Sequence, residues 1–144
     1  MSFCRRALFA VLLSTAPALL GAQSAEEADA SLFLELNNAQ NDGDACRLTF
    51  LVRNETGISI DQAVFETVIF DTAGGVVNLS LFDFRDLPAQ RPRVRQFQLP
   101  KVTCEAVGRM LINGANTCVV NGSENTICDE GLSLSSRLSV ELLG

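Results

Sequence analysis

The stretch from Cys46 to Asn54 constrains most strongly what this chain can fold into. Its apolar side chains fall at every second position, at Leu48, Phe50 and Val52. A period of two is typical of a β-strand that buries one face. Because the stretch begins with a cysteine, we expect a disulfide to tie this strand to another part of the chain.

Similar alternation recurs along the chain. The predicted strands span residues 31–36, 45–54, 61–71, 76–84, 93–99, 109–113 and 132–142. The third of these segments is apolar on both faces, which predicts a central strand, and a glycine turn over 71–75 joins it to the fourth. Pro88 and Pro92 precede the fifth segment and confine its pairing to a sheet edge. Residues 37–44 and 114–128 are predicted to be turns or loops.

These patterns predict one domain over residues 31–144. Its fold class is all-β, an antiparallel, immunoglobulin-like β-sandwich of about seven strands with two disulfides.

Residues 1–22 have the pattern of a secretory signal peptide. Two arginines precede an apolar run that ends at Leu20, and small residues follow it, so cleavage is expected after residue 22 or as late as residue 25. The run is too short for a membrane-spanning helix and contains Pro17. Residues 26–30 then form an acidic, flexible leader. We expect a periplasmic or secreted protein without stable membrane insertion after cleavage; the paired arginines leave both the general and the twin-arginine export route open.

Four cysteines follow the signal peptide, and an even number in an exported chain predicts two disulfides. They are Cys46, Cys104, Cys118 and Cys128, and three pairings are open. We favour Cys118–Cys128, which closes a short polar loop, and Cys46–Cys104, which ties an early strand to a late one. The cysteines lack the close spacing of a zinc site or a redox motif, so we expect no metal and no cofactor.

Composition excludes several classes of function. The chain contains no His, Tyr or Trp, which rules out histidine-dependent catalysis, histidine metal sites and the usual aromatic sugar-binding platforms. All seventeen Asp and Glu but only nine of the eleven Lys and Arg follow the signal peptide, which gives the mature chain a net charge of −8. Acidity of this size argues against nucleic acid as a partner.

One cluster of charge stands out as a candidate site. Arg85, Arg91, Arg93 and Arg95 concentrate positive charge in an otherwise acidic chain. One interpretation is a contact for an anion or an acidic partner. The other, which the pattern favours, is protection of an edge strand against aggregation by charge and proline.

Several segments together resemble a family of small exported alphaproteobacterial proteins of unknown function, whose members are often labelled by a twin-arginine signal. The segments are Leu34-Glu-Leu-Asn37, Cys46-Arg-Leu-Thr-Phe50, Asn54, Phe70-Asp71, Cys104-Glu-Ala-Val-Gly-Arg-Met-Leu-Ile-Asn113 and Cys118. The resemblance implies a periplasmic domain associated with TonB-type energising systems, and it carries over no catalytic residue.

The hypothesis from the sequence is therefore a non-enzymatic periplasmic accessory or protein-interaction module with an envelope protein as its partner. The alternative is a periplasmic protein that binds a small ligand or an anion. The oligomeric state is left open.

Overall fold

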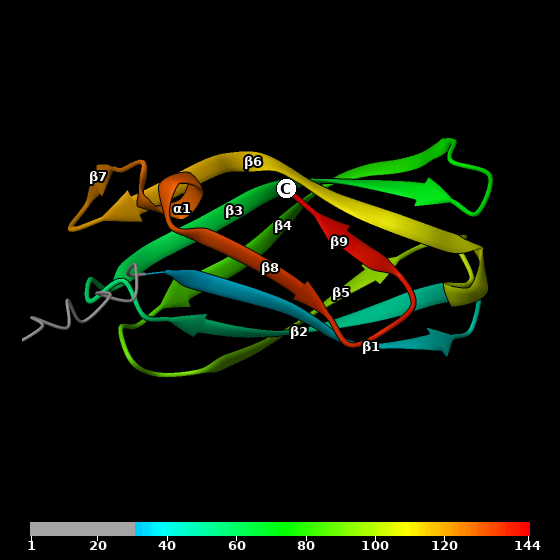
Figure 1. The fold of residues 1–144 in the computed structure, drawn as a ribbon, viewed down its shortest axis with the longest axis horizontal. Coiled ribbons are helices and arrows are strands. Elements are labelled where there is room, and N and C mark those ends of the chain that lie inside the picture. The colour runs from blue at the N-terminus through cyan, green and yellow to red at the C-terminus, as the bar shows by residue number, and fades with distance from the viewer. Residues whose placement is uncertain (1–30) are drawn as a thin grey trace, which may run out of the picture.

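The alternating segments pair into two sheets that pack face to face (Figure 1). The computed structural model describes residues 31–144, so the predicted signal peptide and leader lie outside the described residues. Within the described part of the chain, no helix has the length and apolar character needed to cross a membrane.

The first sheet has four strands. In spatial order they are β5 (Arg93–Leu99), β2 (Ala45–Asn54), β1 (Leu32–Asp42) and β8 (Leu132–Ser136). The second sheet has five. They are β4 (Val76–Leu87), β3 (Ile60–Asp71), β6 (Val107–Val120) and β7 (Ser123–Glu124), with β9 (Glu141–Leu143) also paired to β6. A 3-10 turn, η1 (Cys104–Ala106), precedes β6, and the short helix α1 (Ile127–Glu130) precedes β8.

The predicted fold class is confirmed: the described chain is a two-sheet β-sandwich with two disulfides. The predicted central strand is β3, which lies between β4 and β6, and β5 lies at a sheet edge as the prolines predicted. The sandwich also contains two parallel contacts, β1 with β8 and β6 with β9.

Four predicted boundaries are wrong, and one of them is the end of β4, which continues to Leu87 instead of ending at residue 84. Residues 37–42 extend β1, and the predicted strand at 109–113 is the middle of the 14-residue β6, which absorbs part of the expected loop. Register shifts let β6 stay paired to β3 over this length, although they interrupt its alternation. The single strand predicted at 132–142 is two strands, because the chain leaves one sheet after Ser136 and joins the other at Glu141.

The core between the sheets is apolar and rich in phenylalanine. Phe50 from β2 lies edge-on to Phe82 and Phe84 of β4, with ring centroids 6.2 and 5.5 Å apart. Phe82 also stacks on Phe97 of β5 at 4.2 Å. The aromatic rings therefore join the two sheets, and edge-to-face pairs of this kind add to the stabilisation that burial alone provides.

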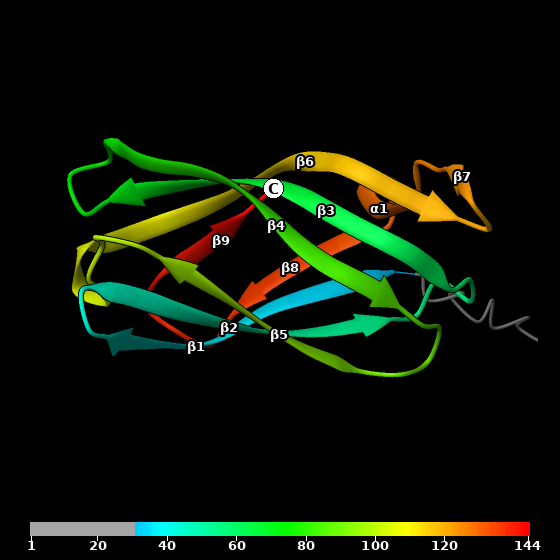
Figure 2. The ribbon, with the colours of Figure 1, turned by 180° about the vertical axis from the view of Figure 1, so that it is seen from behind.

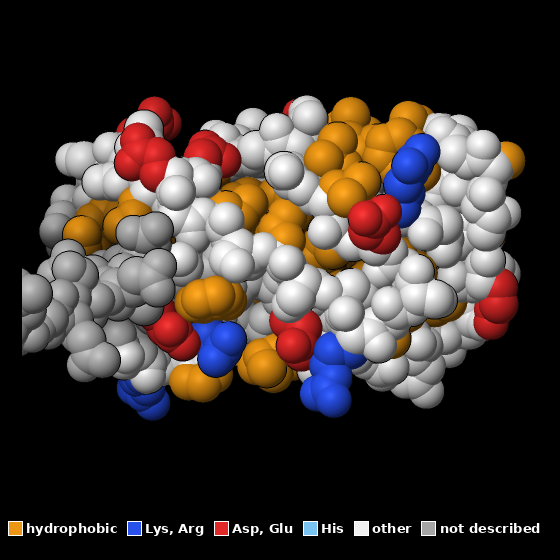
Figure 3. Space-filling view, viewed as in Figure 1, with side chains coloured by type: hydrophobic (Ala, Val, Ile, Leu, Met, Phe, Trp, Pro, Cys, Tyr) orange, Lys and Arg blue, Asp and Glu red, His pale blue; other side chains and the backbone are white. Residues whose placement is uncertain are grey.

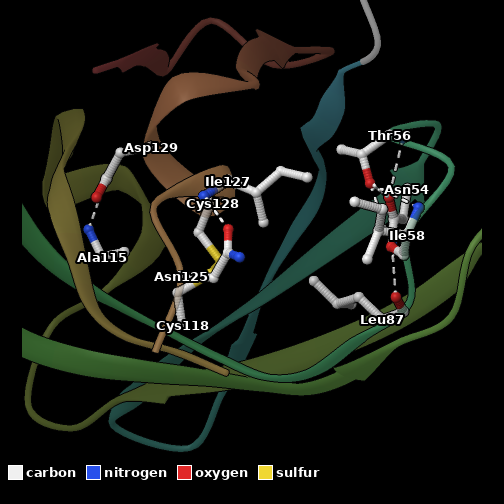
Figure 4. Close-up of a disulfide and its surroundings, with 10 residues drawn as sticks. All are labelled: Asn54, Thr56, Ile58, Leu87, Ala115, Cys118, Asn125, Ile127, Cys128 and Asp129. Atoms are coloured by element: carbon white, nitrogen blue, oxygen red, sulfur yellow. Dashed lines mark hydrogen bonds between the residues drawn. A yellow bond between two sulfur atoms is a disulfide. The ribbon is translucent and has the colours of Figure 1, made fainter. Parts of the chain in front are cut away.

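Both disulfides have the favoured pairing. Cys46–Cys104 ties β2 to the turn before β6, and Cys118–Cys128 ties β6 to α1 (Figure 4). Cys46 and Cys128 are fully buried. The two bonds fix both ends of β6 to neighbouring segments.

Asn54, at the end of β2, is a buried polar residue that joins the two sheets (Figure 4). Its Nδ2 donates to the carbonyl oxygens of Ile58, at 2.8 Å, and of Leu87 in β4, at 2.7 Å. Its Oδ1 accepts from the backbone N–H and the hydroxyl of Thr56. The side chain therefore holds the β2–β3 loop in shape and anchors it to the end of β4.

Removal of each disulfide tests its share of the stability. Replacement of both Cys118 and Cys128 with Ala is expected to lower the free energy of unfolding by about 3 kcal/mol, because it opens a short loop. The same change at Cys46 and Cys104 opens a longer loop and is expected to cost about 4 kcal/mol. Urea denaturation of both variants measures the difference, and a larger loss for the short loop would contradict this account.

Asn54→Ala is expected to destabilise the protein by about 2–3 kcal/mol, since it leaves the buried carbonyl of Leu87 without a donor and removes the side-chain bonds that shape the β2–β3 loop. Asn116→Ala is the matched control, because Asn116 is exposed and its loss is expected to change stability by less than about 0.5 kcal/mol. Equal midpoints of urea denaturation for the two variants would argue against this role of Asn54.

Candidate functional site

β4 and β5 run at the edges of their sheets on the same side of the sandwich (Figure 2), and three of the four predicted arginines lie on these two strands. Arg85 lies on β4, and Arg93 and Arg95 lie on β5. Arg91 lies in the loop between the strands and lines a different, smaller hollow with Arg53 and Glu55. The structure therefore brings three of the four predicted arginines together.

Two of these arginines already bind groups on β4. Arg93 and Arg95 both form ion pairs with Asp86, at 3.4 and 3.3 Å. Arg95 also donates from Nε to the carbonyl oxygen of Phe84, at 2.6 Å, and from Nη2 to that of Asp86, at 2.9 Å. Arg95 thus covers backbone acceptors on the second half of the β4 edge. Within the described chain, Arg85 and Arg91 form no ion pair.

An open hollow of about 540 Å³ lies between the two edge strands. It is lined by Leu81, Asp83, Arg85, Val94, Arg95, Gln96 and Phe97. Asp83 accepts a hydrogen bond from the backbone N–H of Arg85, which holds that residue at a φ of 60°. The hollow therefore mixes apolar with charged and polar side chains, and the guanidinium group of Arg85 is exposed there.

The first half of β4 has an exposed apolar surface that is unusual for an edge strand. Val76, Leu79 and Leu81 are 61%, 59% and 54% exposed, and Val77 is exposed as well. Residues 76–82 contain no charged side chain and no proline. Natural edge strands usually carry such residues because they prevent another strand from pairing. This half of the β4 edge lacks that protection.

The edge strand of the other sheet differs. Val94 of β5 is also 58% exposed, but it lies between Arg93 and Arg95 and follows Pro92. Charge and proline at an edge oppose pairing with another chain. The sequence-based interpretation of edge protection fits β5. On β4, Arg95 protects only the second half of the edge, and the first half has no such protection.

An apolar row continues from β4 across the outer face of its sheet. Leu79 pairs in register with Val68 of β3, Val68 with Leu111 of β6, and Leu111 with Leu143 of β9. Beside this row the Arg109 guanidinium lies 5.2 Å from the centre of the Phe70 ring. Figure 3 shows hydrophobic side chains gathered over this sheet toward the β3–β4 hairpin, next to basic and acidic groups.

Other polar clusters have structural roles. A hydrogen bond from Gln98 and then the charge of Arg47 lower the pKa of Asp42. A hydrogen bond from Asn41 lowers the pKa of Glu105. These contacts favour the ionised carboxylates, so their stabilisation is present above the ordinary pKa and is lost as the pH falls through the lowered values. Residues 31–144 contain no group of Cys, Asp and Glu arranged to hold a metal ion.

The sequence pattern did not identify the exposed row on β4. The alternation over residues 76–84 puts Val77, Leu79 and Leu81 on one face, but it does not show that this face is the outer one. The signal that could have revealed it is the opposite face, where Phe82 and Phe84 follow the same alternation and are the residues that enter the core.

Comparison with known proteins gives a likeness of fold. No family model matches the chain, and no curated protein matches it. The solved structure of IrmA from Escherichia coli superposes with a TM-score of 0.60 at 14% sequence identity. The match covers 72% of this chain and 90% of IrmA. The chain is therefore similar to IrmA in its β-sandwich architecture.

Proposed function

We propose that this protein is an exported, non-enzymatic accessory module that binds an extended segment of an envelope protein at the edge of β4. The observation that carries the proposal is the first half of that strand, which is apolar, exposed and free of charge. Strand addition at such an edge gains affinity from main-chain hydrogen bonds and specificity from alternate side chains.

The backbone of β4 is oriented for such an addition. The carbonyl of Phe84 points away from the sheet, since it accepts a hydrogen bond from Arg95 on the other sheet. β4 pairs with β3 without a register shift between Asn78 and Asp83, and a shift follows between Asp83 and Arg85. Backbone groups alternate in direction along a strand. Because β4 is the outermost strand of its sheet, every second residue between Asn78 and Asp83 presents its backbone groups to the open edge.

An incoming segment would meet different chemistry along β4. Its outward side chains would pack beside Leu79 and Leu81, which favours apolar residues. Farther along, it would meet Asp83 and Arg85 at the hollow between β4 and β5. The arginines at this end of β4 then form a boundary that sets the position of the segment. Arg85 therefore keeps a role in contacting the partner.

The periplasm is the proposed location. Two disulfides are consistent with folding in an oxidising compartment, and residues 1–22 have the pattern of an export signal. The resemblance to the alphaproteobacterial family adds TonB-type energising complexes as a source of the partner. A module without its own chemistry would act there by holding or positioning another protein.

Photo-crosslinking in the cell tests this function. A photoreactive residue at Leu81 is expected to capture an envelope protein, whereas the same residue at Val94 is not, although both sites are similarly exposed, at 54% and 58%. Capture from Val94 alone, or from neither position in a folded and exported protein, would refute binding at β4.

Anion binding is a second candidate, and the exposed Arg85 at the rim of the hollow favours it. Its weakness is that Arg93 and Arg95 already bind Asp86. A thermal-shift screen with phosphate, sulfate and citrate tests it: an anion at a hundred times its Kd would stabilise the protein by about 2.7 kcal/mol. The shift is expected to disappear in Arg85→Gln, and a flat screen with the unmodified protein removes this candidate.

A further inference from the structure

The exposed half of β4 has a symmetrical pattern about Leu79. On the outer face Val77 and Leu81 lie on either side of it, and on the other face Asn78 and Ser80 do. If the strand is laid antiparallel against itself with Leu79 opposite Leu79, Val77 meets Leu81 and Asn78 meets Ser80. Each apolar residue then faces an apolar one, and each polar residue faces a polar one.

We propose that β4 pairs with β4 of a second copy of this chain, antiparallel, with Leu79 on the two-fold axis. The inference rests on the proposed function, because it requires that the β4 edge accept a strand, and it adds a second copy as an occupant of that edge. An isologous contact of this kind uses the same patch on both subunits and closes at a dimer.

Charge favours this edge for self-association. The chain has a formal net charge of −6, so two copies repel over most of their surfaces. Residues 76–82 are neutral, and in the proposed register Asp83 lies opposite Gly75 rather than opposite its own copy. Approach along β4 therefore brings no like charges face to face.

Arg95 limits the pairing to this half of the strand. It occupies the carbonyl oxygens of Phe84 and Asp86, so a second strand finds those acceptors already bound. A pairing that ends near Phe82 covers about 24 Å of strand. That is small for a stable interface, so the dimer forms at high concentration and leaves the edge available to another partner at low concentration.

The pairing also joins the apolar rows of two molecules. Each row runs from Leu143 through Leu111 and Val68 to Leu79, so the two meet at the axis. The cross-strand contact of two leucines at the centre adds side-chain packing to the backbone hydrogen bonds.

Sedimentation velocity of the mature protein tests the dimer. Between about 10 μM and 1 mM, the weight-average mass is expected to rise from that of a monomer toward twice that value. Leu79→Lys places two like charges at the axis and is expected to abolish the rise, while Val94→Lys on the other edge leaves it unchanged. Unchanged thermal midpoints confirm that both variants fold.

Cysteine crosslinking tests the register. Leu79→Cys is expected to form a disulfide-linked dimer on mild oxidation of the folded protein, since residues opposite each other have Cβ atoms about 4.5–5.5 Å apart. Leu81→Cys and Val94→Cys are expected to form no disulfide-linked dimer. A dimer linked through Ser80→Cys instead of Leu79→Cys would overturn the proposed axis.

The results separate this inference from the proposed function. A protein that stays monomeric at 1 mM, with no crosslink at Leu79, overturns self-pairing. If the photoreactive residue at Leu81 still captures an envelope protein, the proposed function stands without the dimer. If neither a second copy nor another protein is captured at β4, both are wrong.

Discussion

Phenylalanine packing between the two sheets is the interaction on which the rest of the structure depends. Phe50 contacts the rings of Phe82, Phe84 and Phe97, which come from the two strands at the open side of the sandwich. A chain without Trp or Tyr has no larger side chains with which to fill this space. The removal of one such ring from a core typically costs about 3–5 kcal/mol. The same packing decides that the phenylalanine face of β4 lies inward, and so forces the leucine face outward.

Much of the fold can be predicted from the alternation of apolar residues, and the errors in the predicted strand boundaries have a common cause. The pattern located the strands around Phe50, the hairpin after Asp71 and the pairing of both disulfides. A period of two records which residues share a face, but it does not record which sheet a strand joins. The segment after Leu132 therefore looked like one strand although it crosses between sheets, and the bulges in β6 disguised a strand as a loop.

The site was predictable in part for the same reason. The clustering of arginines on β5 was visible in the sequence, whereas their partners were not, because Asp86 and the carbonyl of Phe84 reach them only through the packing of the two sheets. The leucines of β4 were visible as a face, yet both faces of that strand are apolar enough to be core. Only the position of the aromatic cluster distinguishes them, and that is a property of the whole fold.

The route of the final segment has a consequence for how the molecule is made. Strand β8 forms one edge of the first sheet, next to β1. The register pairs Leu32 of β1 with Leu132 of β8, 100 residues later. Contacts between such distant parts of a chain form slowly, because the loop between them must first be closed. A newly synthesised chain therefore exposes the flank of β1 until its last strands are made. During that interval the protein would be most available for binding by a chaperone that shields unpaired strands.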